Sequence, residues 1–203
     1  MSIYKLKPAF QWLLRPQVKR LAQRGVTPNQ ITCFALAGSA AVGMVLCLFP
    51  WHGLFVLLPV WFFLRMALNA MDGMMAREYG QQTVFGCYLN ELADIVADAF
   101  LYLPFAQLPE FWPPSVLLFI FLAALAETAG ILGALAGASR RYDGPLGKSD
   151  RAALLGLLAL VLVFVPRSGL YALVFPVLDT LLCLTICNRI RHGMKEAAAK
   201  RNP

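Results

Sequence analysis

Six long apolar segments, separated by short polar breaks, dominate this sequence of 203 residues. They cover residues 30–49, 54–76, 86–108, 115–138, 152–166 and 169–188. A helix of about 20 apolar residues crosses the roughly 30 Å hydrocarbon core of a bilayer. Because 59% of the residues are hydrophobic and only 14% are charged, one soluble core of this size could not bury them. The sequence therefore predicts an all-α integral membrane protein with six transmembrane helices.

Basic residues concentrate in three regions around these segments. They are Lys5, Lys7, Arg15, Lys19, Arg20 and Arg24, then Arg140, Arg141, Lys148 and Arg151, and finally Arg189, Arg191, Lys195, Lys200 and Arg201. Six spans put all three regions on one side, which the positive-inside rule assigns to the cytoplasm. We therefore predict a multi-pass protein of the cell inner membrane with both termini cytoplasmic. The net charge is +7. We expect the basic residues to interact with anionic membrane lipid, and we expect no nucleic acid as partner.

The first 29 residues mix basic side chains with apolar and aromatic ones at loosely helical spacing. This pattern favours an amphipathic helix lying in the cytoplasmic interface of the membrane; the alternative is a disordered basic arm. We therefore divide the chain into three parts: an amphipathic juxtamembrane segment (1–29), a six-helix transmembrane domain (30–188) and a basic cytoplasmic tail (189–203).

Polar residues inside the second and third segments are the first functional candidates, because a charge at the bilayer centre costs at least about 2.5–3.5 kcal/mol. Offsets of three and four residues place three of them, Arg65, Asn69 and Asp72, on one helical face together with the small residues Gly73 and Ala76. On the next segment Asn90, Asp94 and Asp98 recur every four residues. Two antiparallel helices that share a turn bring such faces to the same depth. Converging oxygen atoms suit Mg²⁺ or Mn²⁺.

These residues resemble the signature of the CDP-alcohol phosphatidyltransferase family, D-x2-D-G-x2-A-R-x8-G-x3-D-x3-D. Every spacing is kept from residue 69 to residue 94. All fixed positions match except two, because Asn69 and Asn90 stand where the pattern has its first and third aspartates. The segment from Val26 to Thr32 is also similar to the start of the first spanning helix in this family.

The resemblance implies a homodimer of six-helix protomers, each with a polar cavity facing the cytoplasm. It implies transfer of a phosphatidyl or related phospho-alcohol group from a CDP-linked donor, CDP-diacylglycerol above all, to an alcohol, with release of CMP in phospholipid biosynthesis. Asp94 becomes the catalytic base, and Asn69, Asp72, Asn90 and Asp94 become the positions of one or two metal ions. The expected contacts of the nucleotide and donor are Thr27, Pro28, Asn29, Thr32, Asp72, Gly73, Ala76, Arg77 and Gly86.

The two asparagines lower the formal negative charge of the motif. An amide oxygen still ligates a hard cation, but the metal affinity is expected to fall. Asp98, one turn from Asp94 on the same face, is predicted to compensate as a further metal ligand. Glu91 is the second choice, because it lies about 100° around the helix from Asn90. The alternative is that Asp98 pairs with a polar group on a neighbouring helix.

The loop before the fifth segment supplies a second candidate site. Its basic residues are predicted to bind a phosphorylated acceptor, such as glycerol 3-phosphate, or the lipid phosphate of the donor: Arg140, Arg141, Lys148 and Arg151. Lys148 and Arg151 are the strongest candidates, since the positive end of the helix dipole also favours an anion there. The alternative is that a cytoplasmic loop of this kind is basic only because it sets the topology.

Two other functions compete with the transferase: a small ion or solute transporter that uses the intramembrane carboxylates, and a catalytically degenerate family member. An ion pathway has no need for the fixed spacing from Gly73 to Gly86, which favours the transferase. Arg65 is expected to serve as a counter-ion for the acidic residues or to contact a lipid phosphate. Glu127 and Asp179, in the fourth and sixth segments, are expected to form hydrogen bonds between helices.

Overall fold

The computed structural model describes residues 6–165 and 168–201, and every regular element in these ranges is a helix. The long helices are α1 (Leu6–Gln23), α2 (Pro28–Leu48), α3 (Leu57–Glu78), α4 (Val84–Tyr102), α5 (Pro113–Leu135), α6 (Lys148–Phe164) and α7 (Tyr171–Arg201). Two 3₁₀ helices, η2 (His52–Val56) and η3 (Leu103–Gln107), precede α3 and follow α4. Helices α2 to α7 coincide with the six predicted apolar segments, so the all-helical prediction is confirmed. Lys5 and the end of the segment predicted at 152–166 lie outside the described residues.

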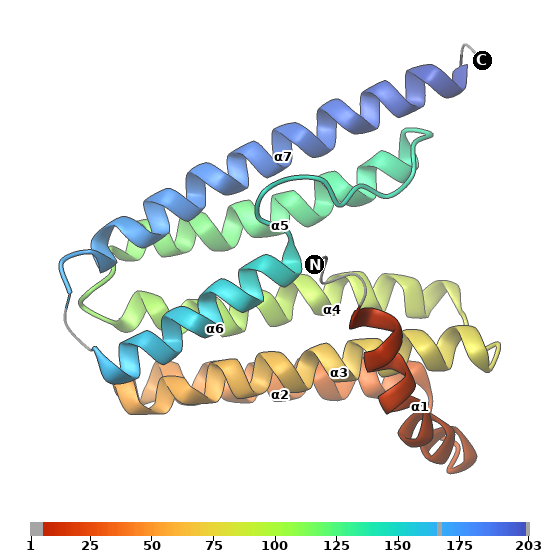
Figure 1. Cartoon of the computed structure of the whole chain (residues 1–203), viewed down its shortest axis with the longest axis horizontal. Coiled ribbons are helices and arrows are strands. Elements are labelled where there is room, and N and C mark those ends of the chain that lie inside the picture. Colours follow the sequence, from red (N-terminus) through yellow and green to blue (C-terminus); the bar gives the residue numbers. More distant parts are fainter. Residues whose placement is uncertain (1–5, 166–167, 202–203) are drawn as a thin grey trace.

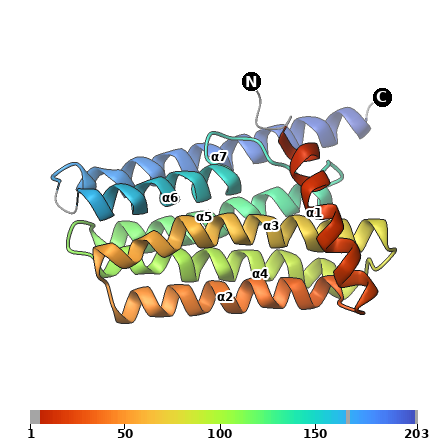
Figure 2. The same cartoon turned by 60° about the horizontal axis from the view of Figure 1, so that its bottom comes forward.

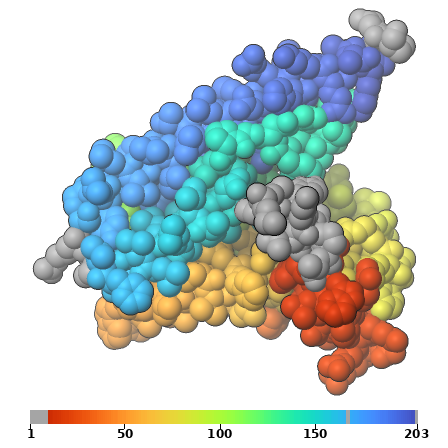
Figure 3. All heavy atoms as spheres, in the orientation of Figure 1, coloured from red at the N-terminus to blue at the C-terminus, as the bar shows by residue number. Residues whose placement is uncertain are grey.

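Helices α2 to α7 run along the long axis of the molecule, and α1 crosses them at one end (Figures 1 and 2). Helices α2, α3 and α4 pack together, and α5 pairs with α7. Helix α6 lies between α7 and α3 on the face seen in Figure 3. The turn between α3 and α4 lies at the same end of the bundle as α1 and the end of α7 (Figure 1).

Four helical stretches are long and apolar enough to cross a membrane: Pro28–Leu48, His52–Glu78, Pro113–Leu135 and Tyr171–Arg201. Helices α4 and α6 are not among them. Helix α4 carries the carboxylates of Glu91, Asp94 and Asp98 within its 19 residues, and α6 has only 17 residues. Large apolar side chains such as Phe34 and Phe63 are exposed on the outside of the bundle, as a surface that faces lipid requires.

Helix α7 continues to Arg201, well beyond the predicted end of the sixth segment at residue 188. The described part of the predicted tail, 189–201, is therefore an extension of the last helix. The reason is compositional: the residues after Cys187 include Met, Lys, Glu and several Ala, all of which favour helix.

Helix α2 approaches its two neighbours closely through small residues. A Cβ atom at Gly43 would lie 2.7 Å from the carbonyl carbon of Phe100 on α4. On the side of α3, the Trp61 ring covers Gly38, and the indole nitrogen donates to Ser39 Oγ at 2.9 Å. Small residues are the usual means by which membrane helices pack this closely. They fix α2 against the helices that carry the motif.

Side-chain caps determine where α2 and α4 begin. Thr27 Oγ1 accepts from the main-chain N–H of Gln30 at 3.4 Å, while Gln30 Oε1 accepts from the main-chain N–H of Thr27 at 2.9 Å. This capping box satisfies two donors at the start of α2, and Pro28 occupies the first turn, where its missing N–H costs nothing. Thr83 caps α4 by accepting from the Gly86 amide at 2.9 Å.

Helix α1 packs on the bundle through one side only. Val18 is fully buried in a cluster with Met74 and Met75 of α3, and Arg15 forms an exposed ion pair with Glu78 at 2.9 Å. Trp12 lies on the other side and is 73% exposed. Helix α1 thus covers the end of α3 that carries the motif.

Aromatic rings fill the opposite end of the bundle. The ring of Phe175 on α7 lies 5.2–5.7 Å, between centroids, from the rings of Phe105, Phe111 and Phe119. Such pairs add to the free energy of burial by about 0.5–1.5 kcal/mol each. Near this end Ser115 donates to Asp179 at 2.7 Å, which confirms the predicted hydrogen bond of Asp179 between helices.

Candidate active site

Three helices bring the first motif residues together. Asn69 on α3 donates from Nδ2 to Asp94 Oδ1 on α4 at 3.0 Å. Three residues further along α3, Asp72 is buried and accepts from Thr32 Oγ1 on α2 at 2.9 Å. Asp72 and Asn69, three residues apart, lie on the same face of α3. The two faces predicted from the helical spacing therefore meet inside the bundle.

The two oxygen atoms of Asp94 have different surroundings. Oδ1 accepts from Asn69 and, at 3.0 Å, from Arg65 Nη2. Oδ2 forms an ion pair with Lys148 at the start of α6. Because the Lys148 side chain is 32% exposed, Oδ2 is on the more open side of the site. One oxygen is thus held by α3, and the other faces an exposed cation.

Asp98 lies deeper, between two buried guanidinium groups. Arg65 Nη1 donates to Asp98 Oδ1 at 2.5 Å, and Arg151 Nη2 donates to Asp98 Oδ2 at 3.1 Å. Asp98 and both arginines are at least 95% buried. Both oxygens therefore accept from guanidinium groups of neighbouring helices, which is the pairing that the sequence left open as the alternative for Asp98.

Glu127 on α5 forms ion pairs with arginines of three different elements. Arg151 on α6 and Arg189 on α7 lie 3.0 and 3.4 Å from its Oε1. Arg140, in the loop between α5 and α6, lies 3.7 Å from its Oε2. Glu127 is 7% exposed, so these contacts form a buried junction of three helices and a loop, and Arg151 joins it to Asp98 of α4.

The remaining loop residues are also paired. Arg140 forms a second ion pair with Glu91 of α4, which gives Glu91 a role other than metal binding. Arg141 donates to both oxygens of Asp143, at 2.8 and 3.0 Å, and contacts Glu196 on α7. Partial burial favours a higher pKa for Asp143, but hydrogen bonds from Arg141 and His192 outweigh it and hold the pKa below its usual value.

The glycines of the motif allow close approaches near the surface. A Cβ at Gly86 would lie 2.8 Å from Asn29 Oδ1, so the segment that begins α2 contacts the start of α4. A Cβ at Gly73 would lie 3.2 Å from Arg77 Nη1, so the exposed guanidinium of Arg77 lies over this glycine. The residues predicted to bind the nucleotide therefore gather at one end of α2, α3 and α4, with Ala76 half-buried beside them.

Oxygen donors at this end fit a hard divalent cation. Asn69 uses its amide nitrogen for Asp94, so its amide oxygen remains available. Asn90 is half-buried, one turn before Asp94 on the same face. Within residues 6–165 and 168–201, no three Asp, Glu, His or Cys side chains form a metal-binding group. Asn69 and Asn90 stand where the family motif has carboxylates, and their amide oxygens are of the type that a hard cation accepts as ligands.

Arg189, one of the three arginine partners of Glu127, is the site residue that sequence reasoning missed. Arg189 is 2% exposed and donates to the main-chain oxygen of Asp143 at 3.3 Å as well as to Glu127. The pattern treated Arg189 as one of several topology-setting charges at the end of the chain. Two features of the sequence could have indicated the pair: Arg189 directly follows an apolar segment, and Glu127 is a carboxylate inside the fourth apolar segment.

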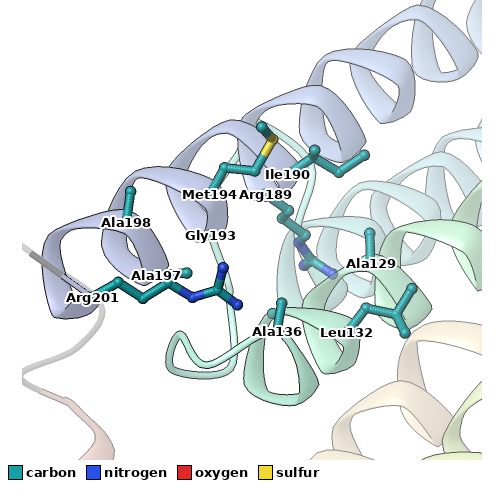
Figure 4. Close-up of a pocket in the computed structure, with 11 residues that line it drawn as sticks. Ala129, Leu132, Ala136, Arg189, Ile190, Gly193, Met194, Ala197, Ala198 and Arg201 are labelled. Atoms are coloured by element: carbon teal, nitrogen blue, oxygen red, sulfur yellow. The ribbon is translucent and has the colours of Figure 1, made fainter.

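A groove of about 560 Å³ lies elsewhere, between α5 and the end of α7 (Figure 4). Small residues such as Ala129 and Ala136 line it, and Arg189 and Arg201 point toward it (Figure 4). None of the motif residues of α3 and α4 borders this groove. The candidate active site is therefore defined by its side-chain contacts and not by this groove.

Comparisons with known proteins agree with this geometry. Residues 25–186 match the family described as CDP-alcohol phosphatidyltransferase. The chain is 45% identical over 199 residues to the inner membrane protein YnbA of Escherichia coli (strain K12), covering 98% of this chain and 99% of that protein. It is 35% identical over 97 residues to a phosphatidylinositol phosphate synthase of Mycobacterium bovis (strain BCG / Pasteur 1173P2), covering 47% of this chain and 43% of that enzyme.

A solved structure has the same fold. The crystal structure of Mycobacterium tuberculosis phosphatidylinositol phosphate synthase (PgsA1) in complex with manganese and citrate superposes with a TM-score of 0.70. The match covers 88% of each chain at 19% sequence identity, so this likeness concerns the fold. Taken with the motif, the family match over residues 25–186 establishes that this chain is a membrane protein of the CDP-alcohol phosphatidyltransferase family.

Proposed function

We propose that this chain transfers a phosphatidyl or related phospho-alcohol group from a CDP-linked donor, CDP-diacylglycerol, to an alcohol and releases CMP. The observation that carries the proposal is the contact of Asn69 with Asp94 across α3 and α4, with Asp72 one turn along the same face of α3. It joins both halves of the family motif in one site. The curated relatives that synthesise phosphatidylinositol phosphate support a role in phospholipid biosynthesis.

The donor is proposed to bind where α2, α3 and α4 meet. Its contacts there are Thr27, Pro28, Asn29, Thr32, Asp72, Gly73, Ala76, Arg77 and Gly86. The two glycines leave room for a ligand near the backbone, and the guanidinium of Arg77 suits a phosphate. Thr27 and Pro28 act through the start of α2, which they define.

Asn69, Asp72, Asn90 and Asp94 are proposed to hold one or two divalent cations, Mg²⁺ or Mn²⁺. A cation bound with the diphosphate would neutralise the charge that develops on the departing CMP. The manganese in the related crystal structure supports this type of cation. Asp98, whose oxygens both accept from arginines, is proposed to position Asp94 through Arg65.

Asp94 is proposed as the base. Its Oδ1 is fixed by Arg65 and Asn69, which orients Oδ2 toward Lys148 and the open side. The acceptor hydroxyl gives its proton to Asp94, and the hydroxyl oxygen forms a bond to the phosphorus of the donor. The bond from that phosphorus to the oxygen of CMP breaks, and CMP leaves with the electron pair. Lys148 lies nearest the base among the four basic residues predicted to contact the acceptor.

We also propose that all six helices α2 to α7 span the inner membrane in a homodimer, with the site facing the cytoplasm. The arginines that pair with the carboxylates of α4 allow this polar helix to lie inside the bundle. The motif and the basic helix α1 lie at the same end (Figure 1), in accord with the positive-inside rule.

The direct test is CMP release by the purified protein from CDP-diacylglycerol with Mn²⁺ and a panel of alcohols. Asp72→Asn and Asp94→Asn are expected to lower the rate at least about a hundredfold, the range of general-base and charge effects in active sites. Asp179→Asn is the matched control, because Asp179 is also buried in a helix but bonds Ser115 near the other end. An inactive wild-type protein with measurable ion flux would instead support the transporter.

A further inference from the structure

Each of the four basic residues first predicted to bind a phosphate has a carboxylate partner. Lys148 pairs with Asp94 and Arg151 with Asp98 and Glu127. Arg140 pairs with Glu91 and Glu127, and Arg141 pairs with Asp143 and Glu196. The positive charge near the base is therefore already neutralised by the protein.

Glu127 is the centre of this neutralisation. Its carboxylate contacts Arg140, Arg151 and Arg189, which come from three separate elements and converge on one point. Three guanidinium groups around one point are the arrangement that binds a phosphate in many proteins. In this protein the anion at that point is the carboxylate of Glu127, which is 93% buried and lies in the middle of α5.

A chain of three ion-paired side chains links the junction to the proposed base. Arg151 connects Glu127 to Asp98, and Arg65 connects Asp98 to Asp94. A phosphorylated alcohol that presents its hydroxyl to Asp94 would bring its phosphate toward these arginines. That phosphate would have to displace Glu127 or lie beside it, and two buried like charges at short distance repel strongly.

We propose that Glu127 is a specificity-determining residue that makes the enzyme select an alcohol without a phosphate, such as an uncharged polyol. The inference rests on the proposed function, because it concerns the acceptor of that reaction. Removal of the Glu127 charge leaves Arg140, Arg151 and Arg189 in place and opens an anion site among them.

The test measures binding and selectivity separately. The melting temperature of the full-length protein in nanodiscs is followed as inorganic phosphate replaces chloride at constant ionic strength. Glu127→Gln keeps the shape of the side chain and removes its charge. It is expected to gain a saturable, phosphate-dependent rise, with an apparent Kd at least about tenfold below that of the wild type, a ratio that corresponds to 1.4 kcal/mol.

Two control variants isolate the charge. Glu127→Asp keeps the carboxylate and is expected to bind phosphate as weakly as the wild type. Glu78→Gln removes the same charge from an exposed ion pair with Arg15 and is also expected to match the wild type. If Glu127→Gln does not fold, the wild-type rates of CMP release with glycerol and with glycerol 3-phosphate decide, glycerol being expected as the faster acceptor.

Phosphate binding by the wild type as tight as that of Glu127→Gln would overturn the proposal, as would faster CMP release with glycerol 3-phosphate than with glycerol. If no acceptor supports CMP release, the proposed function fails. The binding contrast between Glu127→Gln and the wild type then still decides whether Glu127 closes an anion site.

Discussion

Arg65 donates from a single nitrogen, Nη2, to both the side-chain Oδ1 and the main-chain oxygen of Asp94, each at 3.0 Å. Its other terminal nitrogen bonds Asp98. One planar guanidinium thus fixes the Asp94 side chain relative to its own backbone. A lysine has the same charge but no second nitrogen to form the fork.

Arg65→Lys is therefore expected to lower kcat for CMP release by about tenfold to a hundredfold, because a base displaced by about 1 Å loses this much. The KM for the CDP-linked donor is expected to stay near its wild-type value, since Arg65 lies deeper than the donor site. Arg15→Lys, at the exposed pair with Glu78, is the control. Equal loss of kcat in both variants, or none in Arg65→Lys, would argue against a positioning role.

Asn69→Asp tests the reduced charge of the motif. In the absence of metal, the new carboxylate of the Asn69→Asp variant cannot donate to Asp94 Oδ1 and repels it. The melting temperature in EDTA is therefore expected to fall. With Mn²⁺ the added negative charge is expected to lower the metal concentration for half-maximal activity on the order of tenfold. Asn188→Asp adds the same charge on α7 outside the motif. A metal dependence unchanged from the wild type would contradict the assignment of Asn69.

Gly43→Ala tests the packing of α2 against α4. The added methyl group would lie 2.7 Å from the carbonyl carbon of Phe100, a backbone atom that cannot turn aside. The variant is expected to lose about 1–3 kcal/mol of stability through overpacking. Gly53→Ala, where no atom lies within 4 Å, is expected to unfold at nearly the wild-type temperature. Thermal unfolding in detergent gives both values, and similar melting temperatures would refute the close contact.

Asp143→Asn tests the loop that carries Arg141. The folded-state pKa of Asp143 lies below its unfolded value, so its carboxylate stabilises the fold above the unfolded pKa of about 3.9. This stabilisation is lost as the pH falls through the folded-state pKa. At pH 7 the variant is expected to melt a few degrees lower, about 2–4 °C for a loss of 1 kcal/mol. The difference should close in acid; a difference that persists there would point to another cause.

The elements of this fold could be predicted because each leaves a local signal. Apolar stretches predicted all six helices of the bundle, and spacing alone placed Asn69 and Asp94 on facing sides. The partners of the charged residues left no such signal. Arg151 and Glu127 are 24 residues apart, and Arg189 and Glu127 are 62 residues apart, so only the packing of α5, α6 and α7 decides that they meet.

The same limit explains the treatment of Asp98. The four-residue spacing from Asp94 to Asp98 predicted a metal ligand, because spacing within one helix says nothing about residues of other helices. The structure adds Arg65 from α3 and Arg151 from α6, and these occupy both oxygens. Arg65 itself was expected as a counter-ion, since an arginine in an apolar segment needs a carboxylate nearby.

From Asp94 to Arg189 the signs of the buried charges alternate, through Arg65, Asp98, Arg151 and Glu127 in turn. Reversing the sign of any of the four inner members leaves two neighbours facing a like charge, and reversing the sign at either end leaves one. Among related sequences, substitutions at these six positions are therefore expected to occur in compensating pairs. Divergence in the chemistry near Asp94 would then require matching changes as far away as α7.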